Sequence, residues 1–264
     1  MNGRVLIIAG SDSGGGAGIQ ADIKTVTMLD AFAMTAVTAL TAQNTEGVFG
    51  VLPIPPEFIR RQIEVVLDDI GADAIKTGML HDAAVIETVA AVLAERAPDA
   101  PLVIDPVMVA KGGAPLIEAD AIDALKRLLL PRAAVLTPNL PEAEVLTGQP
   151  IGDVAAMRRA GENLLRLGCR AVLMKGGHLS GNELTDLLVT AAGVREWRAA
   201  RIDSRHTHGT GCTLASAIAA GIAQGLAVEA AVERARDYVR RAIASAPGFG
   251  RGHGPLDHAH KLRG

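Results

Sequence analysis

The sequence predicts an α/β fold in which a central, mostly parallel sheet is flanked by helices on both faces. Short apolar runs rich in Val, Ile and Leu alternate with longer amphipathic stretches, which is the pattern of repeated βαβ units. The chain has 264 residues, of which 49% are hydrophobic, and this is enough for one large core. Because no repeat, linker or low-complexity stretch divides the sequence, we expect a single domain over residues 1–264.

Composition argues against several classes of partner. Acidic and basic residues are interleaved, the net charge is −3 and aromatic residues make up only 2%, so we expect no nucleic-acid partner. Residues 206–228 contain no Asp, Glu, Lys or Arg, but most are small, and a helix buried in the protein explains them better than a membrane span. Cys169 and Cys212 fit a reducing compartment, and the N-terminus lacks a signal-peptide pattern, so we expect a cytoplasmic protein with no membrane partner.

The first predicted element is a strand over residues 4–9, whose continuous β-branched run is typical of a buried parallel strand. A glycine-rich loop over residues 10–18 follows it and leads into a helix that ends near Leu29. The loop matches neither the P-loop pattern, because Gly16 stands where lysine is required, nor the dinucleotide-binding G-x-G-x-x-G pattern. Asp22 could reach back over the loop, but taken alone it is better explained as a solvated helix residue.

The sequence then predicts a strand over residues 32–40, a polar loop over residues 41–45 and a short strand over residues 48–54. Two prolines then open a helix over residues 57–69. The apolar side of this helix is predicted to consist of Phe58, Ile59, Ile63, Val66 and Ile70.

From residue 74 onward the alternation of strands and helices becomes regular, which favours parallel pairing. The predicted strands are residues 74–79, 102–105, 133–137, 171–175, 183–190 and 194–202, of which the last two are edge strands. The predicted helices are residues 82–96, 118–129, a short helix from Pro141, residues 153–167, a helix from Thr213 and a last helix over about 227–245.

A glycine-broken turn over residues 207–213 opens directly into an apolar helix. The buried stripe of that helix is predicted to consist of Leu214, Ile218, Ile222 and Leu226. The first N–H groups of a helix lack intrahelical partners and carry positive dipole charge, so Gly209, Thr210 and Gly211 would form a seat for phosphate. Cys212 lies on this seat, where the thiolate is favoured. The alternative is a plain turn with a small buried cysteine.

Ligands of open parallel sheets bind at the carboxyl ends of the strands. Many polar residues and glycines come directly after predicted strands, so one edge of the sheet would gather them. These residues are Gly10, Asp12, Gly78, Met79, Asp105, Lys111, Asn139, Glu142, Lys175, Gly176 and Gly177.

Several of these residues have the chemistry of a phosphoryl-transfer site. Asp105 ends an apolar strand, where a charge is costly unless it faces a solvated site. Carboxylates such as Asp105 and Glu142 suit Mg²⁺, although helix capping explains Asn139 and Glu142 better when each is taken alone. Lys175 would clamp a phosphate, or it is a surface lysine at a strand end. Together with the anion seat, these groups favour phosphoryl transfer.

The chain resembles the hydroxymethylpyrimidine/phosphomethylpyrimidine kinases of thiamine synthesis, within the ribokinase-like superfamily. The resemblance covers nearly the whole chain in the right order. The matching stretches are residues 8–22 (IAGSDSGGGAGIQAD), 76–80 (KTGML), 105–108 (DPVM), 137–143 (TPNLPEA), 174–178 (MKGGH), 207–213 (THGTGCT) and 252–258 (GHGPLDH).

The resemblance implies a ribokinase-like fold and a homodimer that uses ATP and Mg²⁺ to phosphorylate 4-amino-5-hydroxymethyl-2-methylpyrimidine and then its monophosphate. It implies that Cys212 acts as the base or orients the substrate hydroxyl, while the amides from Gly209 to Cys212 hold the transferring phosphoryl group. The residues implied to line the pyrimidine pocket are Gly10, Asp22, Gln43, Met79 and Val107. Those implied to serve ATP and Mg²⁺ are Asn139, Glu142, Lys175 and Gly209, with Asp105 and Glu142 on the metal.

Two other functions remain open. The first is a pyridoxine or pyridoxal kinase of the same superfamily, and the second is a metabolite-binding regulator without catalysis. A carboxamide at Gln43 can pair with the donor and acceptor of an aminopyrimidine, although a polar loop residue is the simpler explanation. The histidines at 253, 258 and 260 fit no strong zinc pattern, and a solvated or docked tail explains them better.

Overall fold

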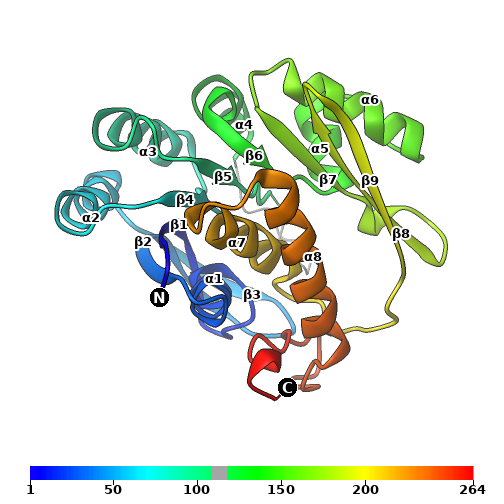
Figure 1. Cartoon of the computed structure of the whole chain (residues 1–264). Helices are drawn as coiled ribbons and strands as arrows, with labels where there is room; N and C mark the ends of the chain where they lie inside the picture. The colour runs from blue at the N-terminus through cyan, green and yellow to red at the C-terminus, as the bar shows by residue number, and fades with distance from the viewer. Residues whose placement is uncertain (109–117, 264) are drawn as a thin grey trace.

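The computed structural model describes residues 1–108 and 118–263. One nine-stranded sheet runs through the molecule in the order β3-β2-β1-β4-β5-β6-β7-β8-β9 (Figure 1). The six strands from β2 to β7 in this order pair in parallel, whereas β3, β8 and β9 are antiparallel additions at the two edges. The strands are β1 (Arg4–Asp12), β2 (Phe32–Gln43), β3 (Val48–Pro53), β4 (Ala74–Thr77), β5 (Leu102–Ile104), β6 (Ala133–Leu136), β7 (Ala171–Lys175), β8 (Glu183–Thr190) and β9 (Gly193–Ala200).

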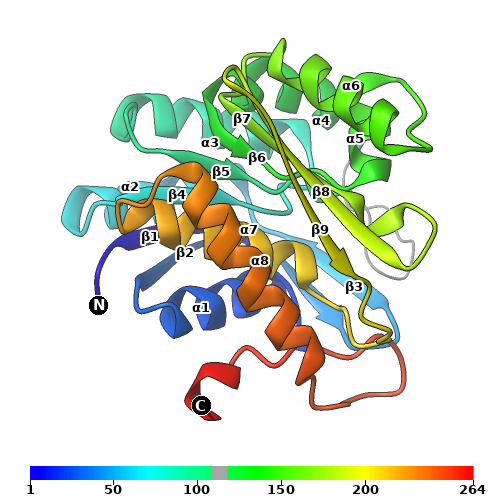
Figure 2. The ribbon, with the colours of Figure 1, turned by 45° about the vertical axis from the view of Figure 1, so that its right-hand side comes forward.

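Helices cover both faces of the sheet, as predicted (Figure 2). Helices α1, α7 and α8 pack on one face, and α2 to α6 pack on the other. The helices are α1 (Gly18–Met28), α2 (Pro56–Asp69), α3 (Ala83–Arg96), α4 (Ala119–Ala124), α5 (Leu140–Thr147), α6 (Val154–Leu165), α7 (Thr210–Ala223) and α8 (Val228–Ala244). No helix in the described ranges is both long enough and apolar enough to cross a bilayer.

Alternation along the central strands divides the core into two layers. In β1, Ile7 belongs to the core under α1, α7 and α8, and its neighbour Ile8 belongs to the core on the opposite face. Both side chains are fully buried. Successive residues of a strand point to opposite faces, so a strand covered by helices on both sides must be apolar throughout.

Strands β1 and β2 extend beyond the predicted ends, into segments expected to be loops. In these extensions Ser11 pairs with Leu40 and Asp12 pairs with Thr41. The predicted polar loop over residues 41–45 therefore begins as strand. Backbone pairing does not depend on side-chain polarity, so a partner strand can extend a ladder through polar residues.

Other boundaries and faces also differ from the prediction. Helix α7 begins at Thr210 and ends at Ala223, so Leu226 lies beyond it and outside the predicted stripe. The predicted helix over residues 118–129 is split into α4 and a π-helical turn, Leu125–Leu129. In α2, Phe58 is 58% exposed and does not share the buried side with Ile59 and Ile63.

Candidate functional site

The start of α7 packs directly on the glycine loop that follows β1. Gly209 caps α7 with a φ of +81°, a conformation that favours glycine. A Cβ on Gly209 would overlap the carbonyl oxygen of Gly16, so the two glycine segments are in contact. Thr210 begins the helix and donates a hydrogen bond from its hydroxyl to the carbonyl of Thr207 at 2.7 Å. The predicted seat is therefore a rigid turn held against a second backbone loop.

Helix α7 presents its first turn to a lysine and a carboxylate. A Cβ on Gly211 would lie 3.3 Å from Nζ of Lys175 and 3.3 Å from Oδ2 of Asp105. The absence of a side chain at Gly211 thus leaves room where the ammonium and the helix start meet. Both the helix dipole and the lysine are positive at this point, which is the arrangement that attracts phosphate oxygens.

Lys175 lies between two carboxylates, one directly after β5 and the other in the first turn of α5. Its Nζ is 3.0 Å from Oδ1 of Asp105 and 3.9 Å from Oε2 of Glu142. Burial opposes the charge on the lysine, but these two carboxylates outweigh it and raise the pKa of Lys175. Burial raises the pKa of Glu142 to about 7, against the attraction of Lys175. Sequence reasoning placed all three residues at this edge, and the structure brings them together.

Glu142 also completes a capping box at the start of α5. The Asn139 side chain accepts a hydrogen bond from the Glu142 N–H at 2.9 Å, and the Glu142 carboxylate accepts one from the Asn139 N–H at 2.7 Å. The same Glu142 carboxylate therefore caps α5 and lies close to Lys175. Among the described residues, no three His, Cys, Asp or Glu side chains are grouped to hold a metal ion. Two converging carboxylates still fit Mg²⁺, which commonly uses one or two together with water and phosphate.

Asp12 organises the glycine loop, and sequence reasoning assigned it no role. Its carboxylate accepts hydrogen bonds from the N–H groups of Gly14, Gly16 and Ala17 at 2.8, 3.1 and 2.8 Å. Nε2 of His208 lies 2.8 Å from the same carboxylate. Burial opposes ionisation of Asp12, but His208 and the backbone donors outweigh it and lower the pKa of the carboxyl. The available signal was the position of His208, which directly precedes Gly209 in the glycine-broken turn.

Two residues predicted for the pyrimidine pocket lie against each other. A Cβ on Gly10 would lie 2.5 Å from Cε of Met79, so the strand ends of β1 and β4 meet there. Val107 is half-buried just beyond Asp105, to whose carbonyl its N–H donates at 2.8 Å. In Gln43, Oε1 accepts a hydrogen bond from the Thr41 hydroxyl at 3.1 Å. These residues come from the carboxyl ends of neighbouring parallel strands.

Asp22 is not a solvated helix residue, because its side chain has no exposed surface. One oxygen lies 2.8 Å from Nζ of Lys76, and the other accepts a hydrogen bond from the Ser216 hydroxyl at 2.7 Å. The carboxylate therefore lies inside the protein, between α1, β4 and α7. Its implied contact with a pyrimidine stays a prediction.

Cys212 is half-buried in the first turn of α7. The expected preference for thiolate is wrong for this structure, because burial raises the pKa of the thiol to about 12, although Lys76 opposes that shift. The thiol is the resting form.

The C-terminal tail docks beside α7. Nε2 of His258 lies 3.0 Å from the Thr213 hydroxyl, and the His208 N–H donates to the carbonyl of Gly254 at 3.1 Å. Of the two predicted alternatives for the tail, docking is therefore correct for His258, which is 5% exposed. Lys111, which sequence reasoning placed at this edge, lies outside the described residues.

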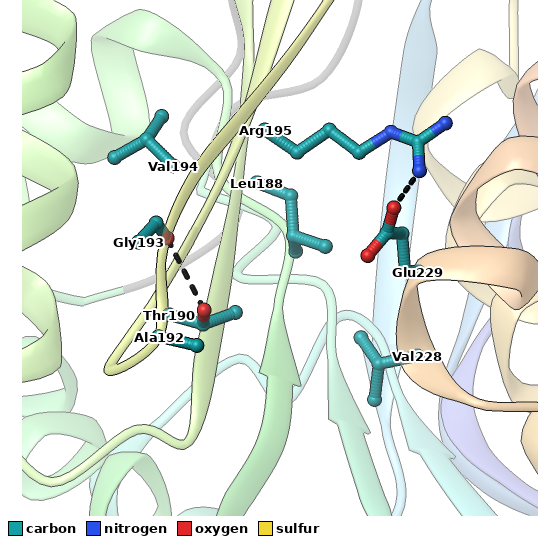
Figure 3. A pocket seen from close by; sticks show the side chains of 8 residues that line it. All are labelled: Leu188, Thr190, Ala192, Gly193, Val194, Arg195, Val228 and Glu229. Carbon is teal, nitrogen blue, oxygen red and sulfur yellow. Dashed lines mark hydrogen bonds and ion pairs between the residues drawn. The ribbon is translucent and has the colours of Figure 1, made fainter.

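A separate cavity of about 380 Å³ lies between the β8–β9 hairpin and the start of α8 (Figure 3). Arg195 and Glu229 form an ion pair across it. None of the predicted site residues lines this cavity.

Fold and site together define a phosphotransferase of the ribokinase-like fold: a largely parallel sheet whose carboxyl edge joins a lysine, two carboxylates and a glycine-broken helix start. The sequence profile of one family, phosphomethylpyrimidine kinase, matches residues 12–257. The chain belongs to this family.

Two curated relatives agree. The chain is 48% identical over 256 residues to the hydroxymethylpyrimidine/phosphomethylpyrimidine kinase of Bacillus subtilis, with coverage of 97% of this chain and 94% of the relative. It is 52% identical over 256 residues to the thiamine biosynthesis bifunctional protein ThiED of Geobacter sulfurreducens. That match covers 97% of this chain but 52% of ThiED, so the chain spans about half of that relative.

Two solved structures are similar as well. The phosphomethylpyrimidine kinase of Clostridium difficile shares 42% identity at a TM-score of 0.81, covering 91% of this chain and 99% of that one. The pyridoxal kinase of Staphylococcus aureus in complex with AMP-PCP and pyridoxal shares 34% identity at a TM-score of 0.91, covering 100% of this chain and 96% of that one.

Proposed function

We infer that this protein transfers the γ-phosphoryl group of ATP to 4-amino-5-hydroxymethyl-2-methylpyrimidine and then to the resulting monophosphate, in thiamine diphosphate biosynthesis. The observation that carries this function is that Lys175 and Asp105 meet at Gly211, in the first turn of α7. A Cβ on Gly211 would lie 3.3 Å from Nζ of Lys175 and 3.3 Å from Oδ2 of Asp105. Family membership supplies the substrate class, since the curated relatives are named for these two phosphorylations.

In the reaction, the substrate hydroxyl oxygen attacks the γ-phosphorus, and the bond from that phosphorus to the β,γ-bridging oxygen breaks to release ADP. Lys175 and the N–H groups of Gly209 to Cys212 would neutralise charge on the moving phosphoryl group. The hydroxyl proton must also leave. Cys212 could accept it only as a thiolate, whereas as a thiol it would orient the hydroxyl.

Mg²⁺ would be held by Asp105 and Glu142, with Asn139 positioning Glu142 through the capping box. When bound, the ion would supply positive charge that offsets the negative charge of the phosphates. Lys175 already counters both carboxylates, so the site can remain folded without the ion.

Gly10, Gln43, Met79 and Val107 would line the pyrimidine pocket, with Asp22 behind them. A pyridoxal or pyridoxine kinase remains the second candidate, because the pyridoxal kinase structure has the higher TM-score and covers the whole chain. Identity favours the pyrimidine kinase. A regulator without catalysis is disfavoured because a sensor has no need for Lys175, Glu142 and Cys212 together.

The decisive experiment measures ADP release by the purified protein with ATP, Mg²⁺ and each of three acceptors: the pyrimidine alcohol, its monophosphate and pyridoxine. We expect kcat/KM for the pyrimidine alcohol to exceed that for pyridoxine by at least about tenfold, because a hydrogen-bonding site discriminates strongly between ring edges. A preference for pyridoxine would establish the second candidate, and no transfer to any acceptor would leave a regulator.

Cys212→Ala tests the role of the thiol. We expect kcat to fall by about 100-fold, within the range for loss of one acid–base or positioning group, while the unfolding temperature stays unchanged. Turnover close to that of the unmodified enzyme would remove Cys212 from the mechanism.

We also propose a single domain, a homodimer and a cytoplasmic location. A single domain is supported by one continuous sheet. A homodimer is supported by the edge strand β3, where Phe49 and Leu52 are 72% and 61% exposed and offer an apolar surface. Light scattering during gel filtration would test the dimer, and a monomer mass at micromolar concentration would reject it. A cytoplasmic location is supported by two free cysteines.

A further inference from the structure

Lys76 is a fully buried lysine in a row of apolar side chains. It lies in β4 between Ile7 of β1 and Val103 of β5, which are its partners in the sheet register. Both neighbours belong to the core beneath α7, and Lys76 itself is 0% exposed. An ammonium group in such a row is costly unless it is paired.

The side chain of Lys76 runs toward the carboxyl edge of the sheet. A Cβ on Gly78, two residues later in the chain, would lie 2.9 Å from Nζ of Lys76. The absence of a side chain at Gly78 therefore leaves room for the ammonium. This end of β4 is the one that reaches Met79 and the candidate site.

Asp22 connects this ammonium to α7 below Cys212. Its carboxylate pairs with Lys76 at 2.8 Å and accepts a hydrogen bond from Ser216 at 2.7 Å. Ser216 follows Cys212 by four residues, so the two side chains lie on the same face of α7. The positive charge of Lys76 is therefore fixed beneath the thiol.

Stability does not account for this pair, since replacing a buried ion pair with apolar residues is often neutral or stabilising. The charge does act on the thiol: Lys76 lowers the pKa of Cys212, against the larger effect of burial. Burial opposes the charge on the lysine itself, but Asp22, Cys212 and Asp105 together outweigh it and hold the pKa of Lys76 above its usual value, so the ammonium stays charged. Asp22 and Asp105 act on both groups: each raises the pKa of Lys76, and each raises the pKa of Cys212, against the effect of Lys76.

We propose that Lys76 is a positioning residue for the phosphoryl transfer: its ammonium, fixed by Asp22, stabilises the thiolate form of Cys212, which is the form that can accept the proton of the substrate hydroxyl. This role rests on the proposed function. The Cys212 thiol first gives its proton to solvent. The thiolate then takes the hydroxyl proton and becomes a neutral thiol again as the new oxygen–phosphorus bond forms and the bond to the β,γ-bridging oxygen breaks. Lys76 itself neither gains nor loses a proton.

The test uses Lys76→Met and Lys76→Gln in the full chain. Both remove the charge, but Gln retains an N–H donor for Asp22 and protects the fold if Met does not. We expect both variants to lower kcat by about 100-fold, with the KM for ATP changed by less than about threefold. A folded Gln variant with kcat within about threefold of the unmodified enzyme would overturn the proposal, since a hydrogen bond alone would then suffice.

A second readout needs no turnover. The rate at which iodoacetamide alkylates Cys212 at about pH 9 reports its thiolate fraction, and mass spectrometry separates it from Cys169 as an internal reference. We expect alkylation at least about tenfold slower in both variants, whereas the exposed Lys261→Met control should alkylate and turn over normally. An unchanged rate would overturn the role of Lys76, while absence of kinase activity in the unmodified protein would instead reject the proposed function.

Discussion

Two lysine–carboxylate clusters flank the start of α7, and they differ in exposure. Lys175 retains 15% of its side-chain surface and lies near two carboxylates, at 3.0 and 3.9 Å. Lys76 has none and pairs with Asp22 at 2.8 Å. A partly exposed ammonium can exchange a carboxylate for a phosphate oxygen, whereas an enclosed one can act only through its electric field. The same residue type is thus suited to binding at one position and to fixed charge at the other.

The largest effect should come from the cluster around Lys175. We expect Lys175→Met to lower kcat/KM for ATP by about 1,000-fold, through both a higher KM and a lower kcat, because it removes a charge that meets the phosphates. Steady-state kinetics with varied ATP would measure this. The corresponding change at Lys76 should leave the KM for ATP nearly constant. Similar KM changes in the two variants would erase the distinction between the clusters.

A smaller effect is expected when the space beside Lys175 is filled. Gly211→Ala would place a methyl group 3.3 Å from both Lys175 and Asp105, so we expect kcat/KM for ATP to fall by about 30-fold through crowding of the phosphate seat. The readout is the same kinetic assay.

Gly152→Ala is the matched control, because nothing lies within 4 Å of a Cβ at that position. We expect it to keep normal kinetics. Equal losses in the two alanine variants would mean that the space at Gly211 has no special importance.

The pyrimidine side should respond differently from both lysines. We expect Gln43→Ala to raise the KM for the pyrimidine alcohol by about tenfold and the KM for ATP by less than about twofold, because a hydrogen-bond partner of the ring is lost. Separate titrations of the two substrates would measure these values. Equal changes in the two KM values would contradict the placement of Gln43 in the pyrimidine pocket.

The contact between the C-terminal tail and α7 involves a neutral side chain, His258, and can be compared with the two charged lysine clusters. Burial lowers the pKa of His258 to about 4, so the imidazole is neutral in the folded protein at pH 7. Its contribution to stability is fully present above about pH 6.5 and is lost as the pH falls through about 4. We expect the free energy of unfolding to decrease by on the order of 1 kcal/mol across this window.

Urea denaturation at several pH values would measure this decrease, and His258→Asn should reduce it. An unchanged pH dependence in that variant would mean that other groups control acid stability.

Much of the fold and part of the site could be predicted from the sequence because both follow local rules. The apolar run over residues 4–9 predicts a buried strand, and the position of Lys175 at the end of another strand places it at the carboxyl edge of the sheet. The structure confirms both placements. The extension of β2 to Gln43 could not be predicted, since pairing with β1 supplies it.

The other features could not be predicted because they depend on contacts between residues far apart in the chain. Asp22 reads as a solvated residue because its partners, Lys76 and Ser216, are 54 and 194 residues away in the chain. The pKa of Cys212 was misjudged for the same reason, because desolvation depends on the packing around the helix and not on the helix start alone. Local sequence indicates which groups are present, but the cost of burying them is set by distant segments.

Asp12 has a further consequence for the energetics of binding. Because one carboxylate gathers three backbone N–H groups and His208, the loop after β1 acquires its shape while the chain folds. A ligand that arrives later finds little conformational entropy left to remove from that loop. Little of the affinity gained from contacts with this loop should therefore be spent on ordering it. We expect the loop to bind its ligand in a preformed shape and not to close around it by induced fit.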